Sequence, residues 1–232
     1  GKTPLPTAVI LIIGVILVLG LTQQGGAEVV DKKVLSGVDI RVYTSATEER
    51  IKEVHPDVVI VATGADPIIP NIPGVDQPNV FEARQVIVSD KLISAANIVV
   101  IGGGLIGLEA MEILTAQGKN VTVIEMLDEV GKDLEMYIKP YVFGIIADKN
   151  IPVHTNTKCV EIGDGFVTVE KDGNKEDISC DAVVIAVGAK SNTSIIDIVK
   201  NLGYEYHVVG DAKQPAKVLE AIWGANEIAR KI

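Results

Sequence analysis

Three glycines, Gly102, Gly104 and Gly107, stand in the spacing G-x-G-x-x-G directly after the apolar run Ile98–Ile101. This pattern is typical of a turn from a β-strand into an α-helix that binds a nucleotide pyrophosphate. The first glycine allows the sharp turn, the second leaves bare backbone for the phosphates, and the third lets the helix pack closely on the strand. Free N–H groups at the helix N-terminus attract the phosphate charge. The candidate residues are Gly102, Gly103, Gly104, Leu105, Ile106 and Gly107.

A carboxylate completes the same unit. Val121–Ile124 is expected to form a second strand that ends at Glu125, 18 residues after Gly107 (125 − 107). A carboxylate at this point accepts hydrogen bonds from the ribose hydroxyls of an adenine dinucleotide, and it would repel a 2′-phosphate. No arginine stands in residues 126–128, so we expect NADH rather than NADPH. The alternative is a tight turn that binds nothing, which the joint presence of strands, glycines, helix and acid disfavours.

Two further segments repeat one pattern and position these residues. Asp57–Ala62 (DVVIVA) and Asp181–Ala186 (DAVVIA) both read as buried strands, because parallel strands covered on both faces are continuous Val/Ile runs. The first runs into Thr63, Gly64 and Ala65, and the second into a turn containing Gly188. We interpret them as the ends of two related half-domains. Open α/β sheets bind ligands at the carboxyl ends of such strands.

The remaining pattern predicts helices at residues 46–54, 132–149 and 216–232. Lys158–Ile162, Gly165–Glu170 and Lys175–Cys180 are three short strands, and the Asp-Gly turn between the last two favours a hairpin. The sequence therefore predicts an α/β fold with a small antiparallel meander inserted in one unit.

Composition narrows the function classes. The chain has 232 residues, is 47% hydrophobic and carries a net charge of −10, which permits a sizeable core and argues against nucleic acid as a partner. Cys159 and Cys180 are its only cysteines. Without a C-x-x-C pair, neither a local redox dithiol nor a zinc knuckle is expected. We expect no metal site and a reducing, cytoplasmic location.

The apolar run Ala8–Leu21 contains 14 residues without a charge. A membrane-spanning helix needs about 20, so a buried strand followed by a helix start is preferred. A membrane-associated NADH dehydrogenase that uses this run as an anchor remains a less favoured alternative.

Four segments together resemble a known family: DVVIVATGA, the Gly102–Gly107 motif with Glu125, DAVVIAVGA, and VVGDAKQPAKVLEAI from Val208 onward. They are similar to the pyridine-nucleotide:flavin oxidoreductases. The short spacing from Gly188 to Gly210 looks most like the carboxyl-terminal FAD/NAD half of the 2-enoate reductase, 2,4-dienoyl-CoA reductase and trimethylamine dehydrogenase group. There, an FMN-bearing barrel with an iron–sulfur cluster precedes this half. We therefore expect a fragment, a subunit or a free-standing relative, with an upstream barrel as partner.

The resemblance implies two Rossmann-like domains, with an NAD-binding domain at residues 91–203 inserted in an FAD-binding domain at residues 1–90 and 204–232. It implies that Thr63, Gly64 and Ala65 lie beside FAD, and that Asp211 accepts a hydrogen bond from a flavin ribityl hydroxyl, next to Gly210. The helix N-terminus at Ala216, Lys217 and Val218 would stabilise the reduced flavin. Glu109, the implied catalytic residue, would sit near the nicotinamide, and Gly188 would line the same cleft.

Each of these residues also has a structural alternative. Asp211 could cap the following helix, Glu109 could be an acid favoured by the helix dipole, and Thr63–Gly64 could be a turn without a ligand. The expected glycine fingerprint for FAD is not recognisable near residues 10–30.

The resulting hypothesis is an NADH-dependent flavoprotein oxidoreductase. It would pass hydride from NADH to FAD and electrons onward, to an FMN or iron–sulfur centre that reduces an activated C=C bond in a small-molecule substrate. The alternative is a nucleotide-binding or electron-relay module that has lost FAD and has no reaction of its own.

Overall fold

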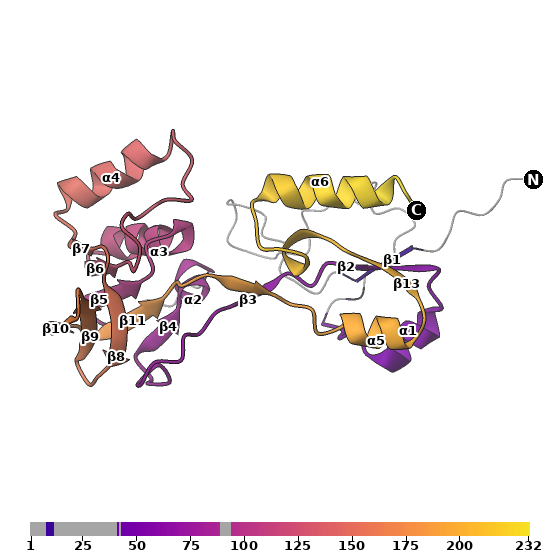
Figure 1. Ribbon diagram of the computed structural model, residues 1–232, viewed down its shortest axis with the longest axis horizontal. Helices are drawn as coiled ribbons and strands as arrows, with labels where there is room; N and C mark the ends of the chain where they lie inside the picture. Colours follow the sequence, from indigo (N-terminus) through magenta and orange to yellow (C-terminus); the bar gives the residue numbers. More distant parts are fainter. Residues whose placement is uncertain (1–7, 12–40, 42, 89–93) are drawn as a thin grey trace, which may run out of the picture. The chain divides into compact units, whose positions relative to one another are not determined.

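The computed structural model describes residues 8–11, 41, 43–88 and 94–232 of the chain. It divides into two compact units (Figure 1). The terminal unit combines residues 1–66 with 191–232, and the inserted unit comprises residues 67–190. Each unit contains a parallel sheet with helices, and the inserted unit adds an antiparallel sheet. The predicted α/β fold with Rossmann-like units is therefore confirmed.

The inserted unit is built on a five-stranded parallel sheet. Its strands lie in the order β4-β11-β5-β6-β7. The chain enters at the β4 edge, runs outward from the central strand β5 through β6 to β7, and returns as β11 between β4 and β5. Their bounds are β4 Val80–Glu82, β5 Asn97–Ile101, β6 Asn120–Ile124, β7 Val153–His154 and β11 Ala182–Ile185.

Alternation along the central strands separates two cores. Val100 and Val184 point to a face covered by helices, whereas Val99 and Val183 point to a face covered by the meander. The helices are α2 Ala83–Val88, α3 Leu105–Ala116 and α4 Lys139–Asp148, and the meander strands are β8 Lys158–Ile162, β9 Phe166–Lys171 and β10 Asn174–Ser179. Burying each such valine contributes about 1.5–3 kcal/mol, so both layers fix the central strands in place.

The terminal unit has a parallel sheet in the order β1-β2-β13. Ile51, Val59 and Val199 belong to the cluster that joins α1 and α5 to one face of this sheet. Figure 1 shows α6 on the opposite side of the sheet. The bounds are β1 Ala8–Leu11, α1 Glu48–Val54, β2 Val58–Val61, α5 Ile196–Asn201, β13 Glu205–Val208, the 3-10 turn η1 Gly210–Ala212 and α6 Val218–Ala229.

Two short strands mark the places where the chain passes from one unit to the other. They are β3, Ala65–Pro67, and β12, Ala189–Ser191, and they pair with each other. The chain thus leaves and re-enters the terminal unit through one paired connection.

The predicted domain boundaries at 90/91 and 203/204 differ from this division. β4 pairs with β11, which draws residues 67–88 into the inserted unit. In the opposite direction, α5 packs its buried Val199 in the core of the terminal unit, so that unit resumes at Ser191. Both boundaries depend on packing partners that are remote in sequence.

Two predicted helices begin later than expected. The helix predicted over residues 132–149 starts at Lys139, with Pro140 in its first turn, because proline fits where no backbone N–H is needed. The helix predicted from Ala216 starts at Val218 and ends at Ala229. None of the α6 side chains is buried, although their spacing is that of an amphipathic helix.

Most of the apolar run Ala8–Leu21 lies outside the described residues, and so does the region expected to carry an FAD fingerprint. Within the part of the chain that the structure describes, no helix has both the length and the apolarity to cross a membrane.

Asp181, which opens the repeated DAVVIA segment, joins β11 to the start of β5. Its Oδ2 accepts hydrogen bonds from the N–H groups of Ala96 (3.2 Å) and Asn97 (2.8 Å) and from the Asn97 side chain (3.0 Å). The Asn97 backbone N–H, the strongest of these influences, lowers the pKa of Asp181 below its ordinary value. The folded chain therefore stabilises the charged form of Asp181 relative to the unfolded chain, and this difference contributes to folding stability.

We expect Asp181→Asn to lower the thermal unfolding temperature at neutral pH. Because the folded pKa is depressed, this stabilisation is complete above the unfolded pKa of about 4 and is lost as pH falls through the folded pKa. The difference in unfolding temperature between the unchanged chain and Asp181→Asn should therefore shrink below about pH 4. Thermal melts followed by circular dichroism at several pH values measure this difference. Asp164→Asn, in the exposed turn before β9, is the matched control. Equal melting of both variants at neutral pH would contradict the assignment.

Candidate functional site

Two of the three motif glycines are required by the fold itself. Gly102 has φ +110°, and a Cβ there would lie 2.3 Å from the Ala186 carbonyl oxygen. A Cβ on Gly107 would lie 1.9 Å from the carbonyl oxygen of Gly102. Backbone meets backbone at both points, so no side chain can be accommodated. These two glycines set the turn from β5 into α3 and the approach of the helix to its strand.

Gly104 differs, because the fold does not demand a glycine there. It is the N-cap of α3 with φ −78° and ψ −175°, a conformation open to any residue. A Cβ at Gly104 would meet only the Asp133 carboxyl group, at 3.3 Å. Gly104 itself, having no side chain, makes no capping hydrogen bond. Gly104 therefore leaves bare backbone at a helix N-terminus, which is what the approach of a phosphate needs.

A carboxylate from the same chain already uses this helix end. The Leu105 N–H donates to both oxygens of Asp133, at 3.0 and 2.9 Å. Leu105 and Ile106 form the first turn of α3, and each side chain is 40% exposed. The N-terminus of α3 thus has the donor and the access that an anion requires.

Glu125 is buried at the end of β6, with 8% of its surface exposed. One carboxylate oxygen accepts from the Gly103 N–H at 2.7 Å, and the other accepts from the Leu127 N–H at 2.8 Å. The structure therefore brings Glu125 to the glycine turn, as the motif predicted. Each oxygen keeps a further acceptor position, and its ribose contact stays a prediction.

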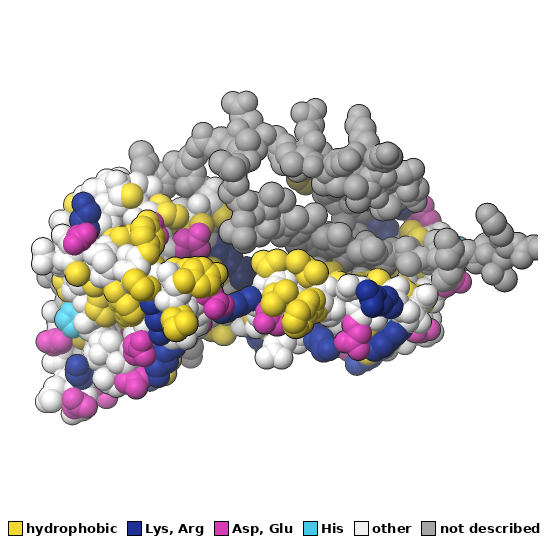
Figure 2. Space-filling model, turned by 90° about the horizontal axis from the view of Figure 1, so that it is seen from above, with side chains coloured by type: hydrophobic (Ala, Val, Ile, Leu, Met, Phe, Trp, Pro, Cys, Tyr) yellow, Lys and Arg dark blue, Asp and Glu magenta, His cyan; other side chains and the backbone are white. Residues whose placement is uncertain are grey.

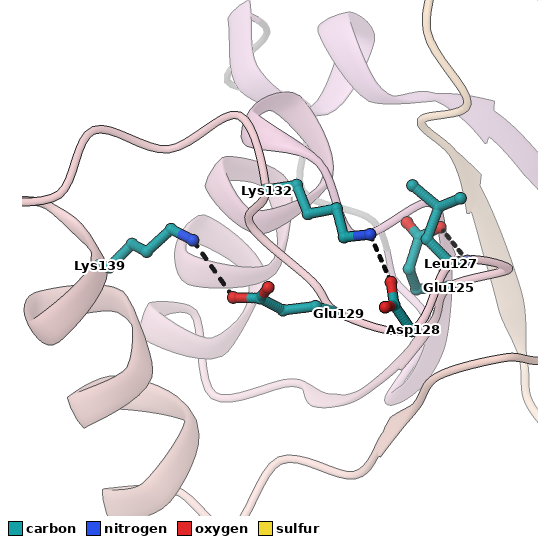
Figure 3. A network of polar contacts seen from close by, with 6 residues as sticks. All are labelled: Glu125, Leu127, Asp128, Glu129, Lys132 and Lys139. Carbon is teal, nitrogen blue, oxygen red and sulfur yellow. Dashed lines mark hydrogen bonds and ion pairs between the residues drawn. The ribbon is translucent and has the colours of Figure 1, made fainter.

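The segment from Leu127 to Lys139 is held by ion pairs and by the glycine turn (Figure 3). Lys132 pairs with Asp128, and Lys139 pairs with Glu129 at 3.2 Å. The Gly131 N–H donates to the Gly103 carbonyl at 2.7 Å. The loop after β6 is therefore fastened against the glycine turn.

Glu109, the predicted catalytic residue, lies exposed on α3. Burial and then the neighbouring Glu112 raise the pKa of the Glu109 carboxyl. Glu112 in turn accepts a hydrogen bond from the Tyr141 hydroxyl at 2.6 Å. A raised pKa is compatible with a proton-handling group, and the place of Glu109 beside a nicotinamide stays a prediction.

Gly188 follows β11, the neighbour of β5. Its φ is +112°, and its carbonyl accepts from the Ile68 N–H at 2.9 Å. Because β5 and β11 are parallel neighbours, Gly188 and Gly102 follow their strands at the same edge of the sheet.

The residues predicted for FAD meet at the ends of β2 and β13 in the terminal unit. Thr63 is buried, and its hydroxyl donates to the Asn192 carbonyl at 2.5 Å. The Asn192 N–H donates to the Gly64 carbonyl at 2.9 Å. Gly64 has φ +74°, and among the described residues no atom lies within 4 Å of where its Cβ would stand. Ala65 begins β3. The turn after β2 thus presents bare backbone, which fits a close ligand.

Asp211 accepts from the Ala216 N–H at 3.2 Å through its side chain and from the Ser191 hydroxyl at 2.7 Å through its carbonyl. The first contact holds the residues leading into α6, but Ala216 precedes the helix, so Asp211 does not cap α6 as the structural alternative had it. Gly210 has φ +58°, Lys217 is the N-cap of α6, and Val218 is its first residue. Their contacts with a flavin stay predictions.

Three residues that take part in these contacts were not predicted from the sequence. Asp133 reaches Leu105 from 28 positions away, and Ser191 and Asn192 reach Asp211 and Thr63 across the strand topology. None of the three belongs to a local motif. Ser191 and Asn192 reach their partners because β12 pairs with β3, and Asp133 reaches Leu105 because the loop after β6 returns to α3.

Comparison with known proteins agrees with this arrangement. The profile of the family described as pyridine nucleotide-disulphide oxidoreductase matches residues 19–229. Bilirubin reductase of Mediterraneibacter gnavus is 37% identical over 179 residues, which cover 77% of this chain and 28% of that protein. Cinnamate reductase of Clostridium sporogenes is 31% identical over 199 residues, which cover 84% of this chain and 30% of that protein.

A solved structure of 2-naphthoyl-CoA reductase superposes with a TM-score of 0.78 at 28% identity, covering 87% of this chain and 31% of that one. The chain thus spans about a third or less of each of these three relatives. Its homologues are flavoprotein oxidoreductases that use FAD and NAD(H). The chain belongs to the pyridine nucleotide-disulphide oxidoreductase family, whose members use FAD and NAD(H).

Proposed function

We propose that the chain is an NADH-dependent flavin reductase module whose electrons pass to an FMN or iron–sulfur centre and reduce an activated C=C bond. NADH binds the inserted unit and FAD binds the terminal unit. The two cofactors supply the hydride transfer, and the protein binds and orients them.

Gly104 carries the proposal for NADH. Packing accounts for Gly102 and Gly107, but at Gly104 only a flexible carboxyl group approaches the missing side chain. A bare backbone at a helix N-terminus, followed by the exposed first turn of α3, fits a pyrophosphate. Glu125 would accept from the ribose hydroxyls while the Gly103 N–H holds its carboxylate in place.

The terminal unit supports the proposal for FAD in a similar way. Gly64 offers open backbone after β2, and the N-terminus of α6 is a second helix end able to stabilise negative charge. Asp211 would accept from a ribityl hydroxyl through the oxygen that does not hold the Ala216 N–H.

The names of two relatives support an activated double bond as the final acceptor. Cinnamate is an unsaturated carboxylate and 2-naphthoyl-CoA an aromatic thioester, and in each an acyl group is conjugated to the bond to be reduced. Because the chain spans only about a third of these proteins, we place the substrate site in an upstream barrel domain or subunit. Disulfide reduction is disfavoured because burial raises the pKa of both the Cys159 and Cys180 thiols, the latter to about 11.

The decisive measurement is the absorption spectrum of the purified chain, followed by anaerobic addition of NADH. We expect flavin bands that bleach with NADH. A colourless protein that still binds NADH after incubation with FAD would favour the module without a reaction of its own. Flavin bands that persist would contradict hydride transfer within this chain.

We expect Gly104→Val to weaken NADH binding by roughly 100-fold, equivalent to about 2.7 kcal/mol. The branched side chain would fill the space above the N-terminus of α3, and the atoms nearest to its Cβ would belong to the Asp133 carboxyl group, not to backbone. Isothermal titration with NADH measures the effect. Gly144→Val, where a Cβ would meet open space within α4, is the matched control. Unchanged NADH affinity in folded Gly104→Val would remove the pyrophosphate from this turn.

Glu125→Gln should narrow the preference for NADH over NADPH by about tenfold, or 1.4 kcal/mol. The amide keeps the size of the side chain but removes the charge that opposes a 2′-phosphate. Glu129→Gln, an exposed acid in the same loop, controls for net charge. The ratio of the two dissociation constants is the readout, and an unchanged ratio would place Glu125 away from the ribose.

A further inference from the structure

The end of α3 that fits a pyrophosphate is engaged by Asp133, which lies in the loop after β6. Both carboxylate oxygens accept from the Leu105 N–H, at 3.0 and 2.9 Å. The same carboxyl group is the closest atom group to the missing side chain of Gly104. The Asp133 carboxylate thus occupies the space beside the Gly104 backbone and accepts from the Leu105 N–H, the donor that a phosphate would use.

Two anions cannot share this position. The Leu105 N–H is a single donor, and a phosphate within hydrogen-bond reach of it would meet the Asp133 carboxylate and be repelled. The loop adds to this repulsion. Residues 125–135 contain five carboxylates and one lysine, and the lysine, Lys132, is paired with Asp128.

Asp133 can leave without unfolding the loop. Its side chain is exposed, whereas the neighbouring Val130 and Leu134 are buried at 5% and 7% exposure. The Gly131 N–H independently holds the loop to the Gly103 carbonyl at 2.7 Å. Rotation of one exposed side chain therefore clears the helix end while the backbone stays anchored.

From this geometry, and resting on the proposed NADH site, we propose that Asp133 is an internal competitor for the pyrophosphate of NADH. Its carboxylate satisfies the N-terminus of α3 in the free protein, and nucleotide binding displaces it. Asp133 thereby weakens the affinity for pyridine nucleotide, which favours release of the oxidised cofactor after each hydride transfer.

The test is NADH titration of the 232-residue chain and of Asp133→Asn and Asp133→Ala, by calorimetry and by the NADH-induced rise in unfolding temperature. We expect both variants to bind NADH about fivefold more tightly, which corresponds to about 1 kcal/mol and lies within the range for an anion at a helix end. The rise in unfolding temperature should be larger than in the unchanged chain. Glu129→Gln removes the same charge from the same loop without touching Leu105, and it should tighten NADH binding much less than the Asp133 variants do.

Equal or weaker NADH binding by folded Asp133 variants would overturn the inference, leaving Asp133 as a helix cap alone. Equal tightening by Glu129→Gln would also overturn it, because net charge would then be the cause. If NADH binds the unchanged chain and Gly104→Val blocks it, the proposed site survives either result. If neither the unchanged chain nor the Asp133 variants bind NADH, the inference and the proposed NADH site both fail.

Discussion

The inserted unit depends on one contact between two pieces of backbone. The carbonyl of Gly102 stands where the side chain of residue 107 would begin, 1.9 Å from that position. This contact sets how closely α3 approaches β5, and hence where the N-terminus of the helix ends up. The sheet, the helix layer and the meander then hold that arrangement through the buried faces of the central strands. Any larger residue at 107 would move the helix and the anion-binding end with it.

At the N-terminus of α3, backbone N–H groups attract an anion, whereas the nearby carboxylates repel one. Backbone N–H groups of Gly103 and Leu105 point at two carboxylates, Glu125 and Asp133, within one turn of chain. One acid is buried and fixed by two donors, whereas the other is exposed and held by one. The difference in burial separates a lasting structural contact from one that a stronger anion can replace. At the proposed NADH site, such an acidic loop would favour exchange of nucleotide over tight retention.

The two units share one arrangement at the ends of the strands that we propose to bind the two nucleotides. In each, a buried parallel strand opens with aspartate and ends in a glycine with positive φ, at Gly64 and Gly188. The chain spans about a third of bilirubin reductase and of cinnamate reductase, and we therefore propose that the reaction is completed outside residues 1–232.

Local sequence determined much of this protein. The glycine spacing, the terminal acid at Glu125 and the repeated strand predicted the α/β fold and the nucleotide edge of the sheet, because backbone clearance and strand burial restrict residue types locally. Helix starts were less predictable from the sequence. The helix expected from residue 132 begins only at Lys139, where Pro140 occupies its first turn. Tertiary structure alone decided the unit boundaries, which follow the pairing of β4 with β11. It also decided that Asp133 lies on the N-terminus of α3, since a single exposed aspartate has no local pattern and its role arises only from where the loop after β6 returns.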